Sequence, residues 1–123
     1  MPPADPAPPF DPAQFLRVAA VLASAEANEA MLRTAVGRAY YAVFLVARDR
    51  LGVVTSEKVH SEVIRLLTRR DRKLGSQMFF LLNLRLAADY QLLPEQESQR
   101  DWQINWRRAR DTATFLLPKI ERI

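Results

Sequence analysis

Apolar residues recur at spacings of three and four along most of this 123-residue chain, and no stretch alternates apolar and polar residues as a β-strand does. The pattern begins at Asp11 and predicts an all-helical protein. Asp11 and Pro12 form an N-cap and first-turn pair, so the first helix should start there and end near Ala25. Its inward stripe is predicted to consist of Phe15, Val18, Ala19 and Leu22.

The longest predicted helix starts with Asn28 as its N-cap and runs to Leu51, where Gly52 stops it. Its inner face should carry Leu32, Ala35, Ala39, Ala42, Val43, Val46 and Leu51, with Tyr40, Tyr41 and Phe44 adding aromatic bulk. The spacing therefore predicts one long element of about 23 residues.

Two further helices follow this long one. The third should begin at Thr55 or Ser56 and fray in the charged run 69–73. The fourth covers residues 74–90, and its apolar positions are so dense that we expect burial on much of its circumference. These positions are Met78, Phe79, Leu81, Leu82 and Leu86.

A fifth helix is predicted to start at Ser98, and Pro118 should kink it or end it near Leu117. Trp102 and Trp106 lie one turn apart on this helix. Stacked nucleic-acid bases could use such a pair, but a core stripe is the better interpretation because two alanines continue the same line.

Short connections between the helices favour an up-and-down bundle of four to five helices over residues 12–123. Residues 1–11 are predicted to be a flexible proline-rich arm, because six of the eight prolines fall in the first twelve residues. The second and fourth helices carry more apolar surface than one bundle needs to bury. We therefore expect a homodimer.

Composition narrows the chemistry that is open to the chain. There is no cysteine and one histidine, His60, which excludes disulfides, thiolate metal sites and sites built on several imidazoles. We expect a cytoplasmic protein without a cofactor or a membrane span. The net charge is +4, and the 18 basic residues are mostly arginine. This bias suits phosphate binding, although GC-rich codon usage would also produce it.

Several polar groups lie on helix faces that should otherwise be apolar. Arg38 is one turn from Tyr41, and Arg85 is one turn from Asp89, which precedes Tyr90. These groups either form internal ion pairs or meet in a shared groove between two helices. We favour the groove, since an exposed ion pair contributes only about 0.3–0.5 kcal/mol and does not explain charges on the most apolar helix.

Three segments resemble the HEPN family of small helical domains: RTAVGRAYYAVFLVAR at 33–48, VHSEV at 59–63 and LRLAADY at 84–90. The resemblance spans roughly residues 15–120 and implies a bundle of four to five helices that is usually dimeric. Many HEPN proteins are metal-independent endoribonuclease toxins encoded beside a nucleotidyltransferase antitoxin. Their motif is an arginine followed four to six residues later by a histidine. Arg85 matches the arginine, whereas Asp89 and Tyr90 stand where the histidine would be.

The resemblance and the departure from its motif together imply a dimeric module that binds a nucleotide, RNA or a nucleotidyltransferase-type partner without full ribonuclease activity. A toxin–antitoxin pair is one such setting. The alternative is a metal-independent endoribonuclease in which Arg85 works with His60 or Tyr90 as the proton-transfer group. A dimerisation unit without a ligand is the third possibility.

A basic stripe is a separate candidate for nucleic-acid contact. It comprises Arg65, Arg69, Arg72 and Lys73, with Lys58 before it and Arg107, Arg108 and Arg110 on the fifth helix. Residues 65, 69 and 72 follow helical spacing, so their side chains should point the same way. A solvated face is the simpler interpretation, and a steep salt dependence of binding would favour nucleic acid.

Overall fold

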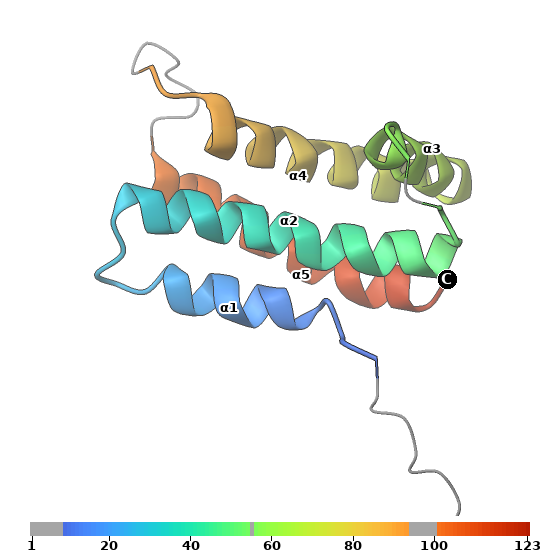
Figure 1. Ribbon diagram of the computed structural model, residues 1–123, viewed down its shortest axis with the longest axis horizontal. Helices are drawn as coiled ribbons and strands as arrows, with labels where there is room; N and C mark the ends of the chain where they lie inside the picture. The colour runs from blue at the N-terminus through green and yellow to red at the C-terminus, as the bar shows by residue number, and fades with distance from the viewer. Residues whose placement is uncertain (1–8, 55, 94–100) are drawn as a thin grey trace, which may run out of the picture.

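The structure is a computed structural model that describes residues 9–54, 56–93 and 101–123 (Figure 1). The helices in these residues are α1 (Gln14–Leu22), α2 (Glu29–Leu51), α3 (Val59–Arg70), α4 (Arg72–Tyr90) and α5 (Trp102–Glu121). No strand occurs within these ranges, which confirms the prediction of an all-helical bundle. None of the described helices has both the length and the hydropathy needed to cross a bilayer.

The central element is α2, which packs against each of the other four helices. It lies between α1 and α4 and in front of α5, while α3 crosses near the start of α4 (Figure 1). The fully buried residues include Tyr40, Leu67, Met78, Leu81 and Leu116, which come from four different helices. Burying side chains of this size is the main source of stability in such a bundle.

The caps predicted for α2 are confirmed. The Asn28 side-chain oxygen accepts a hydrogen bond from the Met31 amide at 2.9 Å. Gly52 ends the helix in the left-handed region at φ 67°, which a residue without a Cβ adopts readily. Both caps depend on local contacts alone, which is why the sequence predicts these boundaries.

The first helix is shorter than predicted. The Asp11 carboxylate accepts from the Ala13 amide at 3.0 Å, so it closes a turn that precedes Gln14, where the helix begins. The end, at Leu22, comes three residues before the predicted Ala25. The expectation that Val18 faces inward is wrong, since 49% of its surface is exposed.

The charged run 69–73 does not fray, because Asp71 joins two helices as a single connecting residue. Its amide donates to the Leu67 carbonyl at 2.9 Å to end α3, and its carboxylate accepts from the Lys73 amide at 2.8 Å to start α4. An extended backbone at Asp71 turns the chain between the two helices. The start of α3 is Val59 rather than Ser56, and Thr55 lies outside the described residues.

The fifth helix passes through Pro118 and continues to Glu121, so the predicted end near Leu117 is wrong. Proline removes one amide donor and pushes away the carbonyl four residues before it. Here that residue is Thr114, and both it and Pro118 are exposed, so water can satisfy the freed carbonyl. The N-cap is Asp101, which accepts from the Ile104 amide at 3.1 Å. The predicted start at Ser98 lies outside the described residues.

The fourth helix is not buried on most of its circumference. Phe79 is 55% exposed, and Phe80 and Leu86 are also exposed. The reason is its position, because α4 lies at the edge of the bundle and packs on its neighbours with one side only.

Candidate functional site

Side chains from α2, α3 and α4 meet in a half-buried group of rings and charges. We call this group the α2–α4 cluster; it consists of Arg38, Tyr40, Tyr41, Phe44, His60, Arg85 and Asp89. Helical spacing places Tyr40, Tyr41 and Phe44 on adjoining positions of α2. His60 comes from the first turn of α3, and its ring stacks on Phe44 with centroids 4.3 Å apart.

The fully buried Tyr40 hydroxyl lies 2.5 Å from His60 Nδ1. Burial raises the pKa of Tyr40 far above its usual value, so this phenol keeps its proton. Burial lowers the pKa of His60, and the positive charge of Arg85 lowers this pKa further. The imidazole is therefore neutral near pH 7. The phenol proton has no other acceptor among the described residues. We therefore infer that Tyr40 donates to Nδ1 and that Nε2 of His60 carries the ring proton.

Arg85 lies next to this pair. Its Nη2 donates to the Tyr41 hydroxyl at 3.1 Å, and its guanidinium carbon is 5.2 Å from the Tyr41 ring centroid. Its Nε is 3.0 Å from Asp89 Oδ2, yet this buried nitrogen makes no hydrogen bond, because its N–H is not aimed at the oxygen. The adjacent rings of Tyr40 and Tyr41 thus bring His60 and Arg85 together within one chain, without a direct bond between the two.

Arg38 approaches the same phenol from the side of α1. Its guanidinium carbon is 5.3 Å from the Tyr41 ring centroid and 5.2 Å from that of Phe15. In the described part of the chain no carboxylate pairs with it. The guanidinium groups of Arg38 and Arg85 therefore both lie beside the Tyr41 ring. Among the described residues Asp89 is the one carboxylate paired with either of them, so the cluster carries an excess of positive charge.

The surface of α2 beside these groups is open at Gly37. Gly37 lies one turn before Tyr41, and a Cβ built there would meet no atom within 4 Å. Glycine in a helix interior costs roughly 0.5–1 kcal/mol relative to alanine. The α2 face next to Arg38 is therefore left uncovered although an alanine would fit.

Four of the five side chains that were predicted to line a groove lie together. The structure brings together Arg38, Tyr41, Arg85 and Asp89, as the sequence suggested, and adds His60 to them. Tyr90 does not join them, since 70% of its surface is exposed at the end of α4 and no described contact links it to the α2–α4 cluster.

The predicted basic stripe is not one helical row. Arg65 is bonded to Glu62, with Nε 3.0 Å from the carboxylate. The break at Asp71 puts Arg72 and Lys73 on a different helix from Arg69, so helical spacing does not align them. On α5, Arg110 pairs with Asp111 at 3.1 Å, while Lys58, Arg107 and Arg108 are exposed.

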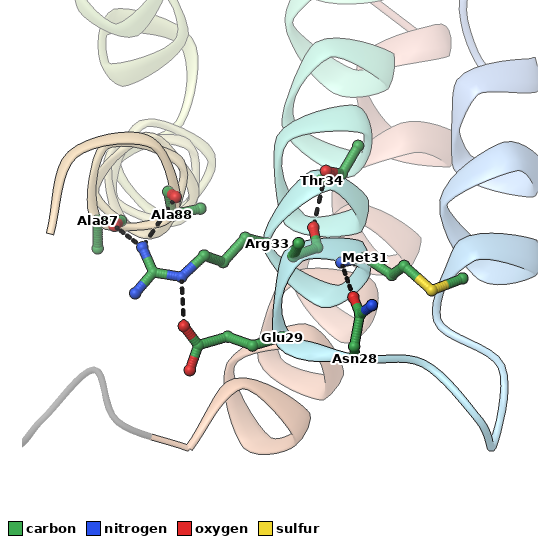
Figure 2. A network of polar contacts seen from close by, with 8 residues as sticks. Asn28, Glu29, Met31, Arg33, Thr34, Ala87 and Ala88 are labelled. Carbon is green, nitrogen blue, oxygen red and sulfur yellow. Dashed lines mark hydrogen bonds and ion pairs between the residues drawn. The ribbon is translucent and has the colours of Figure 1, made fainter. Parts of the chain in front are cut away.

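Arg33 is the residue whose role the sequence analysis missed (Figure 2). Its Nη1 donates to the carbonyls of Ala87 at 3.3 Å and Ala88 at 3.1 Å, and its Nε bonds Glu29 at 3.2 Å. It thereby satisfies backbone acceptors in the last turn of α4. The four-residue spacing of Glu29 and Arg33 signals an ion pair, but nothing local indicates the contact with α4.

The guanidinium of Arg33 also lies 4.4 Å from the ring centroid of Trp102. Trp102 and Trp106 are both buried, which confirms the core interpretation of this pair. Neither is open for stacking on a base.

Comparisons with protein-family models, curated proteins and solved structures returned no match. Within the described ranges, no three histidine, aspartate or glutamate side chains gather as metal ligands.

Proposed function

We propose that this protein is a HEPN-like helical module that binds the phosphate of RNA or of a nucleotide at the α2–α4 cluster. The observation that carries the proposal is the convergence of Arg38 and Arg85 on Tyr41 with Asp89 as the one paired carboxylate. Planar guanidinium groups match phosphate oxygens in pairs of hydrogen bonds. The guanidinium of Arg85 is partly exposed, so its terminal nitrogens are the donors that such a ligand would use.

The resemblance to HEPN domains adds a dimer and a partner to this proposal. Phe79, Leu86 and Tyr90 are exposed and follow spacings of seven and four, so they share one side of α4 next to Asp89. An apolar strip of this kind suits pairing with a second copy beside the cluster. A nucleotidyltransferase-type protein is the second partner in this proposal, as in a toxin–antitoxin pair. Light scattering after size exclusion tests the homodimer, and a monomer mass at micromolar concentration contradicts it.

Binding of a fluorescein-labelled RNA oligonucleotide and of AMP tests the cluster directly. We expect Arg38→Ala and Arg85→Ala each to weaken binding at least about tenfold, which corresponds to about 1.4 kcal/mol. Arg17→Ala is the matched control, because Arg17 is exposed on α1 and makes no contact with the cluster. Equal affinities for all four proteins would contradict the proposal.

Metal-independent cleavage of RNA is the second candidate, and the bond between Tyr40 and His60 favours it. A neutral imidazole oriented through Nδ1 presents Nε2–H, which would protonate the leaving 5′-oxygen, while water takes the proton of the attacking 2′-hydroxyl and returns it to Nε2. The neighbouring guanidinium of Arg85 would stabilise the phosphorane formed when a 2′-hydroxyl attacks the adjacent phosphate. The product is a 2′,3′-cyclic phosphate and a free 5′-hydroxyl.

Cleavage in the presence of EDTA decides between the two candidates. If the protein is a ribonuclease, the wild type cleaves RNA, and both His60→Ala and Arg85→Ala abolish cleavage while binding persists in His60→Ala. Arg17→Ala is again the control, since Arg17 is exposed on α1 and has no described contact with the cluster. RNA that stays intact with wild-type protein supports the binding module alone.

A further inference from the structure

A second site of positive charge lies on α4 and α5, on residues that the α2–α4 cluster does not use. The ring centroid of Phe115 is 4.8 Å from Lys73 Nζ and 5.0 Å from Lys119 Nζ. These ammonium groups come from different helices, and in the described residues neither is paired with a carboxylate. An aromatic ring attracts a cation without neutralising its charge. Phe115 therefore places two positive groups, one from each helix, next to the same ring.

The charge continues along the same side of α5. Arg108, Phe115 and Lys119 follow spacings of seven and four, which place them on one helical face. Arg108 is exposed. Of the two acidic residues along this line, Asp111 is paired with Arg110, and Asp101 caps the start of α5 by accepting from the Ile104 amide. We call the surface formed by Lys73, Phe80, Arg108, Phe115 and Lys119 the α4–α5 edge.

Phe80 places a second aromatic ring on this edge. The two helices run antiparallel (Figure 1), and the contact between Lys73 and Phe115 sets their register. Phe80 lies seven residues after Lys73 on α4, and Arg108 lies seven residues before Phe115 on α5. Phe80 and Arg108 are therefore at the same level along the two helices. Phe80 is 37% exposed. Seven helical residues span about 10 Å, so positive charge and an aromatic surface extend over a length that fits a chain of nucleotides rather than one phosphate.

The edge is separate from the cluster around Tyr41. Five residues of helix separate Phe80 from Arg85, which turns the two side chains about 140° apart around α4. A ligand on the edge would contact α4 and α5, whereas a ligand at the cluster contacts α2, α3 and α4. Removing one site should therefore leave the other intact.

We propose that the α4–α5 edge binds single-stranded RNA through its phosphates, with Phe80 stacking on a base. Unpaired lysine and arginine side chains contact phosphates independently of sequence. Stacking on an aromatic ring needs an unpaired base, which favours a single strand over a duplex. A membrane surface fits less well, because interfacial helices present a continuous apolar face beside their charges. The α4–α5 edge has instead two separate exposed apolar side chains, Phe80 and, near the start of α5, Ile104. This inference goes beyond the proposed function, because it concerns a surface that could bind RNA even if the cluster does not.

Fluorescence anisotropy of labelled oligo-uridine RNA (U12), titrated with the whole protein at several salt concentrations, tests the edge. We expect Lys73→Glu/Lys119→Glu to weaken binding at least about tenfold and to lower the slope of log K against log salt by about 1.4, or 0.7 for each lost phosphate contact. Phe80→Ala should weaken binding to U12 severalfold and leave the salt slope unchanged. A duplex of the same length should bind less tightly, with no effect of Phe80→Ala.

Two controls make the outcome decisive. Arg17→Glu/Arg50→Glu changes the net charge by the same amount on α1 and α2 and should keep affinity within about threefold of wild type. If Lys73→Glu/Lys119→Glu fails to fold, Lys73→Gln/Lys119→Gln takes its place. A thermal melt followed by circular dichroism checks the folding of each variant. The proposal is overturned if wild-type protein binds U12 more weakly than about 100 µM at low salt. It is also overturned if the lysine pair changes nothing, or if the control pair costs as much affinity.

The Arg38→Ala/Arg85→Ala variant separates this proposal from the proposed function. Loss of AMP binding together with a retained effect of the lysine pair supports both sites. If binding of both AMP and U12 depends on Arg38 and Arg85 alone, RNA binding at the α4–α5 edge is contradicted and phosphate binding at the α2–α4 cluster is supported. If AMP does not bind to any variant while U12 binding depends on the lysines, the cluster is wrong and the edge stands.

Discussion

Arg33 and Arg85 have the same exposed fraction and the same kind of ion pair, but their N–H groups donate to different acceptors. Each side chain is 17% exposed, and each is paired with a carboxylate four residues away on its own helix, Glu29 for Arg33 and Asp89 for Arg85. Arg33 also donates to two carbonyls in the last turn of α4. Arg85 instead donates to the Tyr41 phenol, and its Nε makes no hydrogen bond.

The difference shows that the acceptor, and not burial or charge pairing, separates a structural arginine from a candidate binding arginine. Backbone carbonyls at a helix end need a donor in the folded state, so the contacts of Arg33 stabilise the end of α4. The guanidinium of Arg85 can exchange its hydrogen bond to the Tyr41 phenol for one to a phosphate oxygen. The phenol hydroxyl can then form a hydrogen bond to water or to the ligand. We therefore expect loss of Arg33 to affect stability and loss of Arg85 to affect binding.

The largest expected effect comes from Arg33→Ala, which removes the charged donor from the carbonyls of Ala87 and Ala88 and leaves Ala87 with the Gln91 amide alone. We expect the free energy of unfolding to fall by about 2–3 kcal/mol, because hydrogen bonds to charged groups contribute about 1.5–3 kcal/mol. Urea denaturation measures the change. Arg33→Met, which keeps the apolar stem, should recover part of the loss. A smaller loss for Arg33→Ala than for Arg85→Ala would break the comparison.

Arg85→Lys tests the other half of the comparison. Lysine keeps the positive charge but lacks the planar fork, so it cannot offer a phosphate two parallel N–H donors. We expect RNA or AMP affinity to fall about tenfold, or about 1.4 kcal/mol, with a change in unfolding free energy below about 1 kcal/mol. Arg33→Lys is the matched control and should leave affinity unchanged. Calorimetric titration and urea melts on the same samples give both numbers.

Asp89→Asn sharpens the comparison in the opposite direction. Removing the carboxylate frees the charge of Arg85 for a ligand, so we expect anion affinity to rise severalfold. Glu29→Gln, the equivalent change beside Arg33, should have no effect on affinity. Weaker binding in Asp89→Asn would mean that this carboxylate positions Arg85 rather than competing with the ligand.

Titration of His60 should affect the cluster and leave the surroundings of Arg33 unchanged. Burial and the charge of Arg85 lower the pKa of His60 in the folded protein below 6.5, its value in an unfolded chain. The unfolded state therefore binds the proton first, and stability is fully present above about pH 6.5 and declines as the pH falls toward the folded-state pKa. His60→Asn keeps an acceptor for Tyr40 but cannot titrate there, so it should flatten this decline. Melting temperatures at about pH 7.5 and about pH 5.5 check the sign; a wild type that is more stable at the lower pH would contradict it.

The smallest expected effect is that of Gly37→Ala on the open face beside Arg38. Because a Cβ there would meet no atom within 4 Å, the substitution should stabilise the fold by roughly 0.5–1 kcal/mol. If the open face admits a ligand, affinity falls while stability rises, and denaturation and binding measured together show this. A gain in both would mean that the face plays no part in binding.

The sequence predicts those features that depend on local contacts. The cap residues Asn28 and Gly52 determine the ends of α2, and hydrophobic spacing determines the fold class. The meeting of Arg38, Tyr41 and Arg85 was also predictable, because polar groups inside apolar faces need one another.

What could not be predicted depends on how the helices pack. The contact between Tyr40 and His60 requires the crossing of α3 over α2, which no local pattern encodes. The exposure of Phe79 follows from the position of α4 at the edge of the bundle. Pro118 fails as a stop signal because it and Thr114, whose carbonyl it displaces, lie on the exposed side of α5, and only the packing of α5 decides which side is exposed.

The single-residue joint at Asp71 bears on the order in which the chain folds. Thr68 and Gly75 lie seven residues apart and come so close that a Cβ on Gly75 would stand 2.7 Å from the Thr68 Cα. Closing so short a segment costs little chain entropy, whereas bringing α2 and α5 together requires closing a loop of several dozen residues. We therefore expect the α3–α4 hairpin to form before the two longest helices meet.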